Sequence, residues 1–74
     1  MRDTFILKRD GTIYRARRFL RESAGRFHQS LFYEGQVRCD PAAYPSFSGA
    51  EPAMDAAASL MLGQMIDQSA AARS

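Results

Sequence analysis

The Asp10-Gly11 pair, in the middle of an alternating segment, constrains the fold of this chain more than any other feature. Asp-Gly is a preferred dipeptide of two-residue type I′ turns, because both central positions need a positive φ angle. With this pair in the turn, residues 3–20 form an antiparallel hairpin with four apolar side chains on one face: Phe5, Leu7, Tyr14 and Ala16. The alternation has the period of two that a half-buried strand requires, and it predicts that this face meets the core.

A second hairpin is expected to follow the first, and the sequence leaves its inward face open. Residues 21–25 are polar and end in glycine, which is typical of a connection. Residues 26–33 alternate as a third strand, Glu34-Gly35 offers a turn, and residues 36–39 supply a short fourth strand. A shift of register by one residue exchanges the two faces of a strand. Two sets of side chains therefore remain candidates for the core: Phe27, Leu31 and Tyr33, or Phe32, Val37 and Cys39.

The second half of the chain predicts a loop and one helix. Residues 40–51 are rich in proline, serine and glycine, and we expect a loop that crosses the sheet. Pro52 suits the first helical position with Glu51 before it as the cap, so the helix is predicted over 52–68, followed by a frayed tail over 69–74. An apolar stripe marks the face that would lie on the sheet: Met54, Ala57, Ala58, Met61 and Met65.

Together these elements predict a single small domain over residues 1–74, of the α+β class. It consists of an antiparallel sheet of three to four strands, built from two successive hairpins over 3–39, with one C-terminal amphipathic helix packed on one face. Because Met61 and Leu62 are adjacent, at least one of them is expected to point away from the densest contact. With Leu60, it would leave a modest apolar patch that suits a homodimer or a docking surface.

The single cysteine bears on where the protein resides. Cys39 has no partner for an internal disulfide, which fits a reducing cytoplasm. The N-terminus shows no pattern of a signal peptide, and the apolar stretch over 53–66 is too short to span a bilayer. We therefore expect a cytoplasmic protein that does not engage a membrane.

The strand-like half and the helical half of the chain also differ in charge. Residues 1–39 carry nine Lys and Arg against four Asp and Glu, whereas residues 40–74 carry one Arg against four acids. Either pole can engage a charged macromolecule. The predicted contact surface is basic and lies on the first hairpin and the residues after it: Lys8, Arg15, Arg17, Arg18 and Arg21. A secondary acidic pole is formed by Glu51, Asp55 and Asp67. The alternative is a solvated face that only keeps the protein soluble.

No motif for catalysis, metal binding or cofactor binding accompanies these charges, so we expect neither an enzyme nor a cofactor. If the second hairpin pairs as predicted, Ser30 faces Cys39 and His28 lies one step further along the same face. A Cys–His pair is conceivable there, but two ordinary residues on adjacent strands are the simpler interpretation. One histidine and one cysteine also fall short of the four ligands of a structural zinc site.

Two short passages, residues 8–17 (KRDGTIYRAR) and 48–58 (SGAEPAMDAAA), cover a hairpin and the opening of a helix. In these passages the chain resembles small phage-encoded anti-CRISPR proteins that act on type I systems. The resemblance implies an inhibitor that binds a Cascade-type surveillance complex or its recruited nuclease and blocks DNA binding or cleavage. It transfers no functional residue by position.

Two other functions stay open beside the inhibitor. A small nucleic-acid-binding accessory protein would use the basic face, with arginine forks on phosphates and nearby aromatic rings stacking on bases. A homodimerisation or interaction module would use the methionine-rich helix. The expected partner is thus a protein complex or a nucleic acid, and the chain is a monomer or a homodimer.

Overall fold

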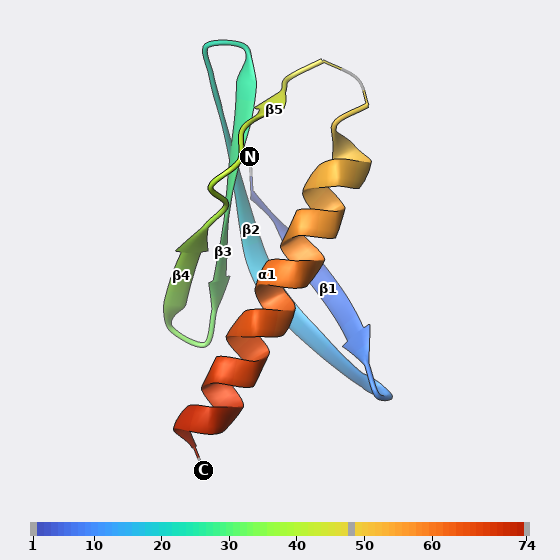
Figure 1. The fold of residues 1–74 in the computed structure, drawn as a ribbon, viewed down its shortest axis with the longest axis vertical. Coiled ribbons are helices and arrows are strands. Elements are labelled where there is room, and N and C mark those ends of the chain that lie inside the picture. The colour runs from blue at the N-terminus through green and yellow to red at the C-terminus, as the bar shows by residue number, and fades with distance from the viewer. Residues whose placement is uncertain (1, 48, 74) are drawn as a thin grey trace.

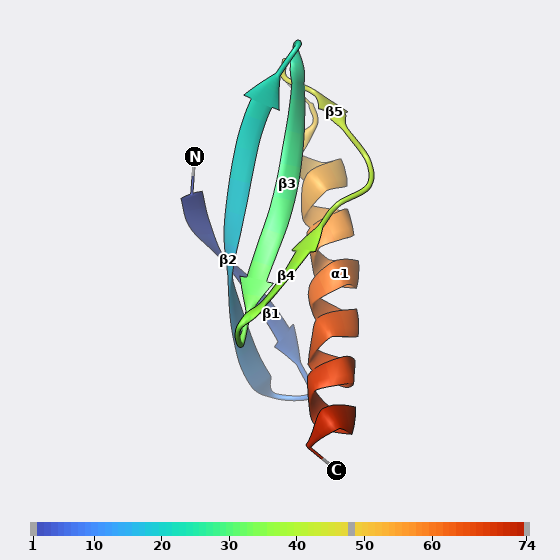
Figure 2. The same cartoon turned by 90° about the vertical axis from the view of Figure 1, so that its left-hand side faces the viewer.

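The computed structural model describes residues 2–47 and 49–73 and confirms the predicted α+β class, an antiparallel sheet with one C-terminal helix. The helix lies along one face of the sheet only (Figures 1 and 2). The elements, in chain order, are β1 (Arg2–Arg9), β2 (Thr12–Ser23), β3 (Arg26–Tyr33), β4 (Gln36–Cys39), β5 (Tyr44–Pro45) and α1 (Glu51–Ala72). The strand order is β1-β2-β3-β4, and β5 also pairs with β3.

The first hairpin has the predicted register. Leu7 pairs with Tyr14 and Phe5 with Ala16, and both turn residues have positive φ angles, 51° at Asp10 and 77° at Gly11. Ala16 is buried, while the other three apolar side chains of that face are partly buried against the core. The dipeptide and the alternation were therefore sufficient to predict this hairpin.

Strand β2 is longer than expected. It continues to Ser23, and the chain turns at Ala24-Gly25, whereas residues 21–25 were expected to form the connection. Both turn residues again have positive φ angles, 54° at Ala24 and 72° at Gly25. An alanine is an unfavourable residue in this left-handed region, so the sequence signal for a tight turn was weak there.

The burial of side chains on β3 shows which face of the second hairpin points into the core. Leu31 is fully buried and Tyr33 is 9% exposed, so their face meets the core together with Phe27. Phe32 and Val37 pair with each other on the opposite face and stay exposed.

The segment between the sheet and the helix is more ordered than a crossing loop. Tyr44 and Pro45 form β5 against Phe27 and Arg26, so β4 and β5 follow one another along the same edge of β3 (Figure 2). Asp40 supports this path, because its carboxylate accepts hydrogen bonds from the Tyr44 hydroxyl at 2.6 Å and from the Ala42 backbone N–H at 2.9 Å.

Helix α1 begins one residue earlier and ends four residues later than the predicted 52–68. Ala50, not Glu51, occupies the N-cap position, so Pro52 is the second helical residue and not the first as predicted. The predicted frayed tail is helical to Ala72 because a tertiary contact holds it. The Ser69 hydroxyl donates to Glu34 Oε2 at 2.5 Å, and the Arg73 guanidinium donates to the same oxygen at 2.8 Å.

The core lies between α1 and the strands β1 to β3. Its helical side is formed by Met54, Ala58, Met61, Leu62, Met65 and Ile66. The expectation that Met61 or Leu62 would turn away is wrong, since both are buried. A helix crossing a twisted sheet presents a broad apolar stripe, which accommodates two adjacent residues 100° apart. Leu60, at 66% exposure, points away from the sheet. The methionines of the stripe are therefore core residues and do not line a groove.

Candidate functional site

The face of the sheet opposite α1 is not covered by any other described element (Figure 2), and we call it the open face. Five of its described side chains are basic: Lys8, Arg15, Arg17, Arg21 and Arg26. The carboxylates of the described strands, Asp3 and Glu22, belong by alternation to the other face. Within residues 2–47 and 49–73, none of the five basic side chains forms a hydrogen bond or an ion pair. The open face is thus cationic and uncompensated.

Two phenyl rings lie among these cations. Phe19 on β2 pairs with Ser30, and Phe32 on β3 pairs with Arg17, so the two rings are diagonal neighbours on adjacent strands. Such diagonal positions are about 7–8 Å apart in antiparallel sheets. Each phenylalanine is 38% exposed, and each therefore offers part of its ring to a ligand.

Further apolar side chains surround the cations. Ile6 and Ile13 are 54% and 51% exposed near the β1–β2 turn, and Val37 is 63% exposed on β4. Ile6 lies opposite Arg15 and Ile13 opposite Lys8, so apolar and basic groups alternate across the hairpin.

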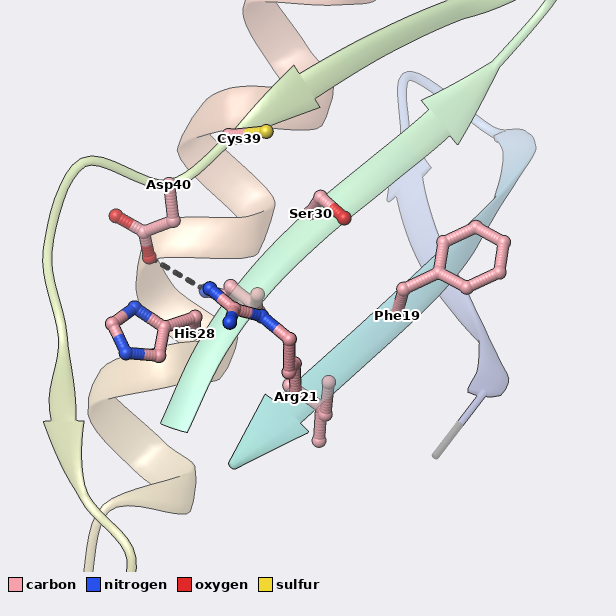
Figure 3. Close-up of a pocket in the computed structure, with 8 residues that line it drawn as sticks. Phe19, Arg21, His28, Ser30, Cys39 and Asp40 are labelled. Atoms are coloured by element: carbon pink, nitrogen blue, oxygen red, sulfur yellow. Dashed lines mark hydrogen bonds between the residues drawn. The ribbon is translucent and has the colours of Figure 1, made fainter. Parts of the chain in front are cut away.

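Two of the hollows that the described residues form on the open face each combine a phenylalanine with arginine. The larger, of about 500 Å³, is lined mainly by Phe19, Arg21, His28, Ser30, Cys39 and Asp40 (Figure 3). The other, of about 450 Å³, is lined by residues that include Thr4, Arg15, Arg17 and Phe32. Because Phe19 and Phe32 are diagonal neighbours, the two hollows adjoin on the sheet.

Asp40 borders the larger hollow where β4 ends, and its carboxylate is bonded on the helix side of the sheet. Its Oδ2 accepts hydrogen bonds from Gln29 Nε2 at 2.8 Å and from the Tyr44 hydroxyl, while Oδ1 accepts one from the Ala42 backbone N–H. Burial acts to raise the pKa of Asp40, but the three hydrogen bonds outweigh it and hold that pKa below its ordinary value. Burial and the Asp40 carboxylate raise the pKa of Tyr44 to about 12. At neutral pH, Asp40 is therefore a charged acceptor and Tyr44 a neutral donor.

Gln29 connects this end of the hollow to the helix. Its side chain is 2% exposed, and Nε2 also donates to the Met54 carbonyl at 2.9 Å. Its other polar atom, Oε1, is buried and has no hydrogen-bond partner among the described residues. The contacts of Nε2 hold Asp40 against the first turns of α1.

Arg18 was predicted to belong to the basic contact surface, but the structure places it on the helix side of the sheet. Its side chain is 14% exposed and forms ion pairs with Asp55 at 2.6 Å and Asp3 at 3.1 Å. The guanidinium also lies 5.2 Å from the centre of the Phe5 ring. The hydrogen bonds to Asp3, with that to Asp55, outweigh partial burial and raise the pKa of Arg18. The physical reason is alternation, since consecutive residues of a strand point to opposite faces.

The predicted acidic pole is likewise engaged internally. Asp55 pairs with Arg18, and Asp67 pairs with Arg9 at 2.9 Å, so sheet arginines neutralise two of its three members. Glu51 lies exposed in the first turn of α1. In the folded molecule, arginines from the basic half of the chain thus pair with aspartates from the acidic half on the helix side of the sheet. The basic side chains of the open face remain without such partners among the described residues.

The Cys39–His28 pair is not assembled as a catalytic pair. Ser30 faces Cys39 as predicted, and His28 lines the same hollow, but no hydrogen bond joins His28 to Cys39 among the described residues. In the part of the chain that the structure describes, no three His, Cys, Asp or Glu side chains are grouped as metal ligands. The same part contains no helix with the length and apolar character needed to cross a membrane.

Sequence reasoning missed three members of the open face and its rim: Phe19, Phe32 and Asp40. Phe19 lies within the predicted hairpin over 3–20 and has the parity of Arg15 and Arg17, so the alternation alone was enough to place it on the outward face. The sequence could not place Phe32, because it left open which face of the second hairpin points into the core. Asp40 had no sequence signal, because its position follows from the hydrogen bonds to Gln29 and Tyr44.

Comparisons with protein-family models, with curated proteins and with solved structures found no match to this chain. The function must therefore be inferred from the residues and the geometry of the open face.

Proposed function

We propose that this chain is a non-enzymatic binding protein whose open face binds a single strand of nucleic acid. The observation that carries the proposal is the combination on one sheet face of two phenyl rings on adjacent strands with five basic side chains that have no ion pair among the described residues. No carboxylate of the described strands points from that face to repel phosphates.

The two kinds of side chain correspond to the two parts of a nucleotide. Arginine and lysine neutralise phosphates and release counterions, which supplies sequence-independent affinity. Exposed aromatic rings on a sheet stack with bases that are not stacked in a duplex. Arg17 lies between Phe19 on its own strand and Phe32 across from it, so phosphate and base contacts are interleaved. This interleaving favours a single strand over a duplex.

The experiment is a titration of fluorescein-labelled single-stranded and duplex oligonucleotides, followed by fluorescence anisotropy. We expect tighter binding of the single strand, with an affinity that falls steeply between about 50 and 200 mM salt. The double variant Arg15→Ala/Arg17→Ala is expected to make the slope of log K against log[salt] shallower, by the amount that corresponds to about two lost phosphate contacts. Phe32→Ala is expected to weaken binding about tenfold at constant salt slope.

Arg73→Ala is the matched control. It removes one arginine from the end of α1, where Arg73 pairs with Glu34 and lies away from the open face. It should leave affinity almost unchanged. Equal losses in Arg73→Ala and in single open-face variants would contradict the proposal, and so would no binding of any oligonucleotide at low salt.

A second candidate is the inhibitor of a type I CRISPR system that the resemblance implies. Ile6, Ile13 and Val37 favour it, since exposed aliphatic side chains beside arginines suit a protein surface better than a phosphate backbone. In this proposal the protein resides in the bacterial cytoplasm and its open face docks on an acidic patch of a Cascade-type complex or its nuclease. In this proposal the protein inhibits its target only by covering the surface to which it binds.

The inhibitor proposal is tested by phage plating on an immune type I host that expresses the chain. Rescue of plating, co-purification with the surveillance complex and loss of both in an Ile13→Asp variant are expected. Unchanged plating on hosts of all type I subtypes would contradict it. Ala56→Asp is the control, because it adds the same charge to an exposed position of α1, on the other side of the sheet from the open face.

A further inference from the structure

Strand β1 forms one edge of the sheet, and no other described strand lies beyond it (Figure 1). We propose that this edge is a second binding site, which takes an extended acidic segment of a partner protein as an added antiparallel strand. The site consists mainly of the backbone of β1, so the inference does not depend on the proposed binding of nucleic acid.

The pairing with β2 leaves half of the backbone groups of β1 pointing away from the sheet. Arg9 and Thr12 flank the two-residue turn and form a hydrogen-bonded pair, and such pairs alternate with non-bonded ones along an antiparallel ladder. The outward N–H and C=O groups therefore belong to Thr4, Ile6 and Lys8. Among the described residues, no backbone hydrogen bond outside the ladders involves these three. An extended segment placed beside β1 would satisfy these groups.

The two edges of the sheet differ in how well they resist such pairing. The other edge is made of β4, with four residues, and β5, with two, and it contains Pro41 and Pro45. Short strands and prolines are devices that stop the edge of a sheet from pairing. In contrast, β1 has eight residues, no proline and an uninterrupted register with β2, and its central residues 4–7 are uncharged. Of the two edges, β1 is therefore the one suited to an added strand.

The side chains of β1 offer apolar contacts on both faces of an added strand. On the helix side, Phe5 and Leu7 are only partly buried where they pack against the core. On the open face, Ile6 is 54% exposed. Side chains directly opposite one another in antiparallel strands lie about 4.5–5.5 Å apart, so a neighbouring strand would cover all three. This apolar contact would add to the affinity that the backbone hydrogen bonds supply.

The charge around the edge selects the partner. The nearest charged side chains on the open face, Lys8 on β1 and Arg15 on β2, are basic and form no ion pair among the described residues. A carboxylate on the same face of the added strand would lie beside Lys8. A second copy of the chain would instead bring its own open-face cations onto the same surface, because opposed residues of antiparallel strands share a face. The charges therefore favour an acidic segment over a second copy.

Alternation then fixes the pattern of the partner segment. Residues opposite Thr4, Ile6 and Lys8 lie on the open face and exchange backbone hydrogen bonds with them, so acidic residues fit there. The residues between these lie on the helix side, opposite Phe5 and Leu7, so apolar residues fit there. A segment that alternates acidic and β-branched apolar residues along the length of β1 matches both faces.

The test uses three fluorescein-labelled peptides and the whole chain, with binding followed by fluorescence anisotropy. EVEVEVEV has the matching pattern, EEEEVVVV has the same composition without the alternation, and KVKVKVKV has the alternation with the opposite charge. We expect EVEVEVEV to bind about tenfold more tightly than either of the other two. Equal affinity for EVEVEVEV and EEEEVVVV would overturn the proposal, because it would show that charge alone determines binding. No binding of EVEVEVEV would overturn it as well.

N-methylation of EVEVEVEV tests the backbone contact on the unmodified protein. Methyl groups on the nitrogens of the glutamates remove the N–H groups that face β1, and they should lower the affinity to that of EEEEVVVV. Methyl groups on the nitrogens of the valines lie on the far side of the added strand, and they should change the affinity by less than about twofold. Equal effects of the two modifications, or the reverse order, would overturn the antiparallel addition.

Two isoleucine variants locate the site on the protein. Ile6→Pro removes an N–H that points away from β2, so it should keep the hairpin and lower the affinity for EVEVEVEV about tenfold. Ile13→Pro is the matched control, because Ile13 is 51% exposed, lies opposite Lys8 on β2 and pairs with no residue of β3. It should leave the affinity unchanged. Circular dichroism verifies that both variants fold, and the N-methylated peptides test the site without any variant.

The outcomes separate the edge from the open face and from a second copy. Peptide binding that is lost in Arg15→Ala but retained in Ile6→Pro would overturn the proposal and show a contact of the peptide with the open face. A mass of twice that of the monomer without peptide, restored to the monomer by Ile6→Pro, would assign the edge to a second copy and overturn it too. Oligonucleotide binding is measured separately, and its absence would leave the edge site in place.

Discussion

At the scale of single residues, alternation along β2 gives two neighbouring arginines different roles. Arg17 points from the open face and has no ion pair among the described residues, while Arg18 is nearly enclosed between Asp3, Asp55 and the Phe5 ring. The two side chains have the same chemistry and are adjacent in the sequence. Their function therefore depends on the face to which each one points.

This difference predicts that the same substitution affects stability to different extents at the two positions. Arg18→Ala should lower the free energy of unfolding by about 1–2 kcal/mol, because it removes hydrogen bonds between charged groups and the packing of the side-chain stem. Arg17→Ala should change it by less than about 0.5 kcal/mol, as expected for an exposed position. Urea denaturation followed by circular dichroism measures both. An equal loss of stability in the two variants would contradict the assignment of faces.

The turn between β2 and β3 contains a second residue-scale feature. Ala24 has a φ angle of 54°, in a region that asparagine tolerates better than alanine. Ala24→Asn should therefore raise the free energy of unfolding by about 0.5–1 kcal/mol. The control is Ala43→Asn, an exposed alanine that is not among the residues with positive φ, where no gain is expected. Thermal or urea unfolding that shows no difference between the two variants would exclude strain at the turn.

At the scale of elements, the end of α1 depends on the β3–β4 turn. Glu34 lies in that turn and receives hydrogen bonds from Ser69 and Arg73, which lower its pKa below the ordinary value of 4.5. A carboxyl whose pKa is depressed by folding stabilises the folded state above its unfolded pKa, and this contribution is lost as the pH falls through the folded pKa. The last turn of the helix is therefore linked to acid titration of one residue.

We expect the variant Glu34→Gln to reveal this link. At pH 7 it should be less stable than the unmodified protein, and the difference should disappear as the pH falls below about 4.5. Urea midpoints measured against pH for the two proteins test this. Hydrogen exchange of the amides over residues 69–72 should be faster in the variant at neutral pH. A stability difference that persists at pH 2, or grows toward it, would mean that another group holds the end of the helix.

At the scale of the whole molecule, internal ion pairs separate two surfaces of different character. On the helix side, Arg9 pairs with Asp67 and Arg18 with Asp55, and Arg38 donates to Gln64 and Gln68. These contacts join the sheet to α1, and the two ion pairs among them also compensate charge. The open face keeps its cations, so the excess positive charge of the protein is concentrated where binding is proposed.

This distribution predicts the oligomeric state. Two sheets that meet through their open faces would bring like charges together, and the methionine stripe is already buried in the core. Light scattering at moderate salt should therefore give a mass near 8.3 kDa, that of the monomer. A mass of twice this value would contradict the charge argument and would favour the homodimerisation module as the function.

Local chemistry by itself determined the first hairpin, the class of the fold and the approximate helix. The register around Asp10-Gly11 could be derived because a two-residue turn and an alternation of period two leave one solution. The proline and the helix-forming residues after it marked α1, and Arg15 and Arg17 were correctly expected beside Lys8 on the outward face. All these features depend on residues close in sequence.

Only the tertiary structure decided the features that join distant residues. The inward face of β3 depended on which side α1 covers, and β5 and the last turn of the helix depended on partners many positions away, such as Glu34 for Ser69. The same is true of the site, because an ion pair across 37 residues of chain compensates the charges of Arg18 and Asp55. A sequence shows how much charge a chain carries, but the packing of its elements decides which of those charges remain uncompensated.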